Sequence, residues 1–152
     1  MNQARSAIVV GVDGSPGSEG ALRWAAKQAQ LTGAELHAIT SWQTPSAYGY
    51  YVDYSDADAA AEAQKTLEQV ISKSLGTPPS VPVVTSVVKG QPAEVLVEAS
   101  RSAELLVVGS RGRGAFTAML LGSVSQHCVQ HAACTVVVVR PLQKTDTRQG
   151  TE

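Results

Sequence analysis

Two glycine-rich segments carry the residue types that could bind a phosphate, and the longer one is Val107-Val108-Gly109-Ser110-Arg111-Gly112-Arg113-Gly114. Nine further residues separate Gly112 from the pair Gly122-Ser123. Glycine lets backbone N–H groups approach a ligand closely, so such a loop can form an anion-binding concavity. A helix that begins at Ser123 adds free amides and a favourable dipole, and the two arginines add positive charge. The segment predicts a phosphate site; the alternative is a loop that needs its glycines only for tight turns.

The second segment is Val10-Gly11-Val12-Asp13-Gly14-Ser15, where a carboxylate follows an apolar run. Asp13 could accept a hydrogen bond from a ribose hydroxyl or hold a divalent cation against phosphate oxygens, because carboxylates supply hard oxygen ligands. The alternative is that Asp13 or Ser15 only caps the helix that follows.

Strand-like and helical patterns alternate along the chain and must position these two segments. β-Branched runs predict strands over Ala7–Asp13, Glu35–Ser41, Val81–Val88, Glu104–Ser110 and Thr135–Arg140, and helical spacing predicts helices over Ser18–Thr32, Ala57–Leu75, Pro92–Ser102 and Ser123–Ala132.

Alternation of this kind is typical of a doubly wound α/β domain, and apolar runs such as Val136–Val139 favour a parallel sheet with helices on both faces. For the strand order 3-2-1-4-5, ligands bind beyond the carboxyl ends of strands one and four. Both glycine segments would then face one crevice.

Charge and hydropathy exclude several classes of function. The 152 residues carry 12 Lys and Arg against 13 Asp and Glu, which leaves no basic field to hold a nucleic acid or a membrane surface. Apolar runs fall far short of the roughly 20 residues that span a bilayer, and Met1–Ser6 does not resemble a secretory leader. We therefore expect one cytoplasmic domain, residues 1–142, a polar tail, residues 143–152, and neither nucleic acid nor membrane as a partner.

Other signatures and candidate groups have less support. No G-x-x-x-x-G-K-[ST] motif is present, so a P-loop ATPase is not supported. His127 and His131 have the spacing of two metal ligands, but Cys128 stands where a zinc protease needs glutamate. We favour structural roles for these histidines and for His37, and we expect Cys128 and Cys134 to be reduced, buried thiols.

The complete spacing Gly109-x2-Gly112-x9-Gly122-Ser123 resembles the signature of ATP-binding universal stress proteins, and Val12-Asp13-Gly14-Ser15 resembles their first-strand motif. The resemblance covers Ala7 to Pro141. It implies a five-stranded parallel sheet that binds ATP, in a homodimer paired through the last strand, here Val136 to Arg140.

The resemblance also assigns residues to parts of the nucleotide. Asp13 would lie near the ribose or a Mg²⁺ ion, the backbone of Ala38 would meet the adenine, and Val88 would line the base pocket. The tyrosine-rich connection Tyr48 to Tyr54 lies outside the family's signature, and a flap, an interface and a self-packed loop all stay open for it. The phosphate ligands would be Gly109, Gly112, Gly122 and Ser123, with Ser110, Arg111, Arg113, Gly114 and Val124 in the same stretches, and Gly11, Gly14 and Ser15 would surround Asp13.

The sequence thus predicts an ATP-binding protein of the stress response that acts as a sensor or regulator, with Mg²⁺, and that is not an enzyme beyond slow ATP hydrolysis. Two alternatives remain. One is a cyclic AMP-binding protein of the same fold, which needs to hold one phosphate rather than three. The other is an interaction protein in which the crevice is vestigial.

Overall fold

A computed structural model describes residues 6–44, 55–112 and 121–141. The tyrosine-rich segment Tyr48–Tyr54, the predicted ligands Arg113 and Gly114, and the tail over residues 143–152 lie outside these ranges.

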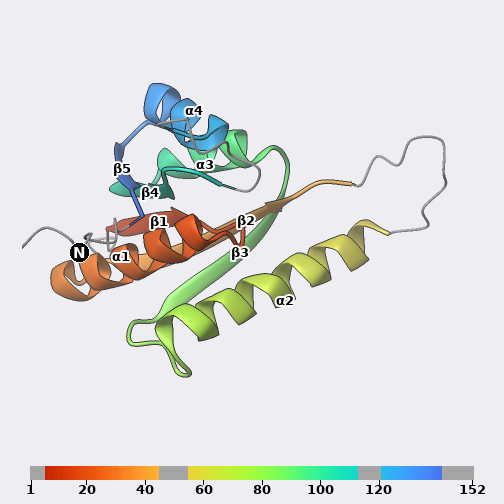
Figure 1. Ribbon diagram of the computed structural model, residues 1–152, viewed down its shortest axis with the longest axis horizontal. Helices are drawn as coiled ribbons and strands as arrows, with labels where there is room; N and C mark the ends of the chain where they lie inside the picture. Colours follow the sequence, from red (N-terminus) through yellow and green to blue (C-terminus); the bar gives the residue numbers. More distant parts are fainter. Residues whose placement is uncertain (1–5, 45–54, 113–120, 142–152) are drawn as a thin grey trace, which may run out of the picture.

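Within the described residues, strands and helices alternate strictly, and the five strands form one parallel sheet of order β3-β2-β1-β4-β5 (Figure 1). This confirms the predicted fold class and strand order. The elements are β1 (Ala7–Gly11), α1 (Pro16–Thr32), β2 (Glu35–Trp42), α2 (Asp56–Leu75), β3 (Val83–Lys89), α3 (Pro92–Ser100), β4 (Leu105–Gly109), α4 (Ser123–His131) and β5 (Thr135–Val139).

Helices cover both faces of the sheet, which explains the continuous apolar runs of its central strands. In Figure 1, α1 and α2 lie on one side of the sheet and α3 and α4 on the other. Alternate residues of β1 enter the two cores: Ile8 and Val10 pack with Leu22 on the α1 and α2 side, and Val9 packs with Leu96 on the α3 side. A strand buried on both faces has no polar side to alternate with.

Local capping sets the two ends of α1. Ser15 is the N-cap and accepts a hydrogen bond from the Ser18 amide, while Pro16 occupies the first turn. Gly33 ends the helix with φ +75°, a conformation that glycine adopts without a steric penalty. The helix therefore begins two residues before the predicted Ser18, directly after its capping serine.

Strand lengths differ in a way that shapes the edge of the sheet. β1 makes its last pair, Gly11 with Ile39, and β2 then continues for three residues to Trp42, which pairs with Lys89 of β3. At about 3.3 Å per residue, β2 and β3 project roughly 10 Å beyond the end of β1. The projecting strands form a wall beside the carboxyl ends of β1 and β4.

Among the described helices, none combines the length and the hydropathy that crossing a bilayer requires.

Candidate functional site

A cavity of about 800 Å³ opens at the carboxyl ends of β1 and β4, where the strand order reverses. This volume lies within the roughly 300–1,000 Å³ of small-molecule sites. Both glycine segments line it, as predicted from their placement after these strands. Of the predicted site residues, the lining contains Gly11, Asp13, Gly14, Ser15, Gly109, Arg111, Gly112, Gly122, Ser123 and Val124.

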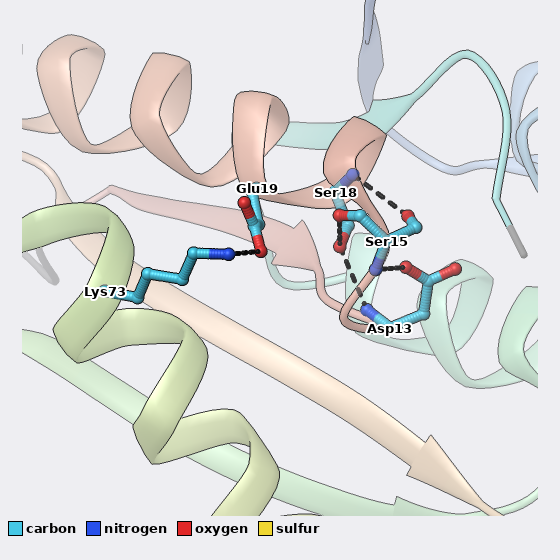
Figure 2. Close-up of polar contacts among 5 residues, drawn as sticks. All are labelled: Asp13, Ser15, Ser18, Glu19 and Lys73. Carbon is cyan, nitrogen blue, oxygen red and sulfur yellow. Dashed lines mark hydrogen bonds and ion pairs between the residues drawn. The ribbon is translucent and has the colours of Figure 1, made fainter.

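The turn after β1 holds the carboxylate of Asp13 in a defined orientation (Figure 2). Its Oδ1 atom accepts a hydrogen bond of 2.9 Å from the Ser15 amide, and the Asp13 amide donates to Ser18 Oγ at 3.3 Å. Ser18 Oγ in turn donates to the Ser15 carbonyl at 3.0 Å. Asp13 is exposed, whereas both serines are buried. The capping role of Ser15 is therefore real, and the same turn also presents Asp13 to the cavity.

Ser18 is a residue of the candidate site that the sequence did not predict. It lines the cavity and makes three of the hydrogen bonds in this turn. Beyond it in Figure 2, Lys73 of α2 forms an ion pair of 3.2 Å with Glu19, which ties α2 to the first turn of α1. The sequence did contain a sign of this role, because Ser18 follows the helix-capping residue Ser15 by three positions.

The loop after β4 is fixed to α4 through one buried residue, Ser110. Its carbonyl accepts a hydrogen bond of 2.6 Å from the Gly122 amide and one of 3.0 Å from Ser125 Oγ, and its own amide donates to the Val139 carbonyl. Ser110 is 2% exposed and is absent from the described lining. Its place is behind the loop, where it holds the start of α4 against the end of β4.

The N-terminus of α4 faces the cavity through Ser123 and Val124. Gly122 is its N-cap, and within the described ranges no side chain caps the helix, in contrast to α1, where Ser15 does so. The first amides of a helix have no partner within that helix, and its dipole concentrates partial positive charge there. This end of the cavity is thus suited to an anion.

The positions of the glycine signature differ in how strongly the surrounding structure requires glycine. A Cβ atom on Gly109 would lie 2.8 Å from the backbone C and O atoms of Gly17, so β4 and α1 touch backbone to backbone. A Cβ atom on Gly112 would lie 2.8 Å from Asp13 Oδ2, so this glycine lets the two predicted segments meet. At Gly122 the nearest atoms to such a Cβ would be 3.4 Å away, an ordinary contact. Gly14 has φ +82°, which a side chain would strain.

A scan against protein-family models matches residues 5–140 to the universal stress protein family. The chain belongs to this family. A universal stress protein of Mycobacterium tuberculosis is 42% identical over 135 residues, which cover 87% of this chain and 44% of the relative. The chain therefore spans about half the length of the curated relatives it matches.

Solved structures with the same fold include the universal stress protein UspA from Lactobacillus plantarum, with a TM-score of 0.71 and 26% identity over 91% of this chain and 100% of that one. A universal stress protein in complex with cAMP has a TM-score of 0.68 and 25% identity over 90% of this chain and 98% of that one. The universal stress protein from Archaeoglobus fulgidus in complex with dAMP has a TM-score of 0.63 and 25% identity over 88% of this chain and 96% of that one.

The wall that β2 contributes to the cavity of this universal stress protein begins one residue after Ala38. Ala38 is fully buried in the core beside α1 and α2, and the lining starts at Ile39 and Thr40. Thr40 Oγ1 donates a hydrogen bond of 2.8 Å to the Val12 carbonyl, which joins this wall to the end of β1. Val88 is 39% exposed on β3 and is likewise absent from the described lining.

Helices α2 and α3 supply lining residues that sequence reasoning did not find. From α2, the small residues Ala59 and Ala63 lie one turn apart on the side that faces the cavity, followed by Thr66. From α3, Pro92, at the first helical position, lines the opposite side. Alanines spaced four apart were a weak signal for a close approach. The remaining members are Val12, Ser41, Trp42, Gln43, Glu62, Leu67, Val95, Leu96, Val108 and Ser125.

The other candidate groups have structural surroundings. His37 pairs with Glu35 at 3.1 Å, and His127 lies against His131 on the exposed side of α4 with ring centroids 4.5 Å apart. Across the part of the chain that the structure describes, no three metal-binding side chains come together. Burial raises the pKa of the Cys128 thiol to about 11, so this fully buried group is neutral at physiological pH.

Proposed function

We propose that this universal stress protein binds an adenine nucleotide, ATP with Mg²⁺, in the cavity between β1 and β4. One observation carries the proposal: the α4 N-terminus, which no described side chain caps, and the oriented carboxylate of Asp13 line the same cavity of about 800 Å³. The first can hold phosphate oxygens and the second can hold a ribose hydroxyl or a cation.

The chemistry of the lining fits a charged ligand with a polar and an apolar part. The amides of Ser123 and Val124 and the positive charge of Arg111 suit phosphate groups. Asp13 Oδ2 approaches Gly112 so closely that a phosphate in this loop would lie near a carboxylate. Two negative groups at that distance favour a divalent cation between them, which Mg²⁺ supplies when it arrives with the nucleotide. The role of the protein's own residues would be to bind and orient.

The relatives support the adenine base and leave the number of phosphates to experiment. One solved relative is described in complex with cAMP and another with dAMP. We favour ATP because the complete spacing Gly109-x2-Gly112-x9-Gly122-Ser123 resembles the signature of ATP-binding universal stress proteins. Binding would then act as a signal in the stress response, through conformation or choice of partner, with at most slow hydrolysis.

We also propose that the chain forms a homodimer through β5 over Val136 to Arg140. β5 is an edge of the sheet in the described residues, and Val136–Val139 are only half-buried. An apolar edge strand left open is prone to pair with another chain. A second copy of this strand would cover both the apolar side chains and the free backbone groups.

The test begins with mass spectrometry of the small molecules that acid releases from the purified protein. Calorimetric titration with MgATP and with cAMP then follows on the wild type, on Gly122→Val and on its matched control Gly122→Ala. An alanine Cβ has room at 3.4 Å, whereas the valine methyl groups would obstruct the amides of α4. We expect the valine variant to bind MgATP at least tenfold more weakly, about 1.4 kcal/mol, and the alanine variant to stay within about threefold.

Three results would count against parts of the proposal. Equal MgATP affinity for Gly122→Val and the wild type would show that the α4 N-terminus does not hold the phosphates. A cAMP affinity at least tenfold above that of ATP would favour the cyclic nucleotide. Absence of binding to both nucleotides would favour an interaction protein with a vestigial crevice.

A further inference from the structure

The tip of the wall formed by β2 and β3 carries an aromatic side chain that faces the cavity. Trp42 is the last residue of β2, three residues beyond the pair Gly11 with Ile39. It is also the single aromatic residue among the described residues that line the cavity. Trp42 therefore lies about 10 Å along the strand direction from the end of β1, on the part of the wall that the glycine segments do not reach.

A lysine from the neighbouring strand holds this ring. Lys89 pairs with Trp42 in the β2–β3 register, and its Nζ atom lies 5.5 Å from the centroid of the Trp42 ring. The same Nζ atom lies 2.8 Å from Oδ2 of Asp56, the first residue of α2. Asp56 Oδ1 accepts a hydrogen bond of 3.1 Å from Thr44. The ring is thus fixed by a chain of contacts that joins the ends of β2 and β3 to the start of α2.

Exposure indicates that this ion pair positions the ring more than it stabilises the fold. The side chains of Lys89 and Asp56 are 54% and 55% exposed, and exposed pairs contribute little to stability. Trp42 lines the cavity, whereas Lys89 is absent from the described lining. A cation held against one side of an indole fixes its orientation through attraction to the π system.

We propose that Trp42 is the stacking surface for the base of the bound nucleotide, and that Lys89 and Asp56 are residues that position its ring. This inference rests on the proposed nucleotide function. If the phosphates lie at the α4 N-terminus, the base must occupy another part of the cavity, and the apolar residues Trp42, Ala59 and Ala63 are among those that line it. Stacking accepts any base, because every base has a π face. Trp42 would therefore contribute affinity for nucleosides as a class, without selecting adenine.

The test separates base from phosphate by titrating MgATP and magnesium tripolyphosphate in parallel. The variants are Trp42→Leu, Trp42→Phe, Lys89→Met and the control Trp24→Leu, which alters a residue of α1 that is 36% exposed and outside the described lining. We expect Trp42→Leu to weaken MgATP binding about tenfold or more with tripolyphosphate unchanged. Trp42→Phe should keep most of the wild-type affinity for MgATP. Lys89→Met should lose less of that affinity than Trp42→Leu, and Trp24→Leu should bind MgATP as the wild type does.

Fluorescence gives a second readout that a merely structural role would not move. In a Trp24→Phe background, Trp42 is the sole tryptophan, since the chain has two. MgATP should quench its emission and tripolyphosphate should not, while Lys89→Met should shift the emission of the free protein.

The outcomes also separate this inference from the proposed function. The inference is overturned if Trp42→Leu binds MgATP within twofold of the wild type, or if it loses tripolyphosphate to the same extent. It is also overturned if the wild type binds MgATP no more tightly than tripolyphosphate, although the phosphate site would then stand. A wild type that binds neither ligand would end both proposals.

Discussion

Gly109 and Gly122 belong to one glycine signature, yet the structure predicts a larger loss of stability when Gly109 is replaced by alanine than when Gly122 is. The Cβ atom of Gly109→Ala would lie 2.8 Å from the backbone of Gly17, and backbone atoms cannot move aside as a flexible side chain can. Overpacking of this kind costs about 1–3 kcal/mol. Because Gly109 does not have a positive φ, alanine also gains about 0.4–1 kcal/mol from the smaller entropy of the unfolded chain. The net loss of folding free energy should be about 1–2 kcal/mol.

Gly122→Ala is the matched control within the same signature. Its Cβ would meet nothing closer than 3.4 Å and its φ of −72° suits alanine, so the main cost is the poorer N-cap, under about 1 kcal/mol. Urea unfolding followed by circular dichroism gives the free energy of unfolding of both variants. In thermal unfolding, Gly109→Ala should have a midpoint roughly 2–8 °C below that of the wild type. If Gly109→Ala is as stable as the wild type, or if Gly122→Ala is the less stable of the two, the assignment of Gly109 to helix–strand packing is wrong.

Three further predictions concern other parts of the molecule. Burial raises the Cys128 pKa from 9.0 to about 11, so the unfolded state loses this proton first and stability should fall between pH 9 and 11. The loss should reach about 2–3 kcal/mol at the upper end and be absent from Cys128→Ala in urea titrations across that range. Gly14→Ala should destabilise the turn by about 1 kcal/mol, because φ is +82°, and Gly14→Asn should recover part of this in the same unfolding assay. The Val139 carbonyl points toward β4, so the amide of the preceding residue, Val138, points to the outer edge of the sheet. Val138→Pro removes this amide and should convert a dimer to a monomer, as measured by light scattering. A dimer that persists in this variant would refute pairing through β5.

The order of the elements and the place of the cavity could be predicted because both depend on local patterns. Apolar runs bounded by polar residues predicted every strand to within a few residues, and helical spacing predicted α1 to within two residues. The strand order, taken from the alternation of elements and the family resemblance, brought the two glycine segments to one edge, and the cavity lies there.

Contacts between distant residues decided the rest. Residue 109 must be glycine because the backbone of Gly17, in α1, packs directly against it. The spacing of residues along the chain does not reveal this contact. Ser110 occurs within the glycine loop, yet its carbonyl fixes α4 from behind the cavity. Ala38 is buried in the core on the α1 and α2 side, and the described lining of the cavity begins only at the next residue, Ile39.

What the sequence by itself determined is the alternation of strands and helices, the two glycine segments and their meeting at one edge of a parallel sheet, because hydrophobic period and turn chemistry are properties of neighbouring residues. Only the tertiary structure decided how far β2 projects beyond β1, that Trp42 and Lys89 meet at its tip, and that α2 and α3 complete the walls. These features arise from the packing of side chains far apart in the chain, and packing depends on the volumes and distances of the whole fold.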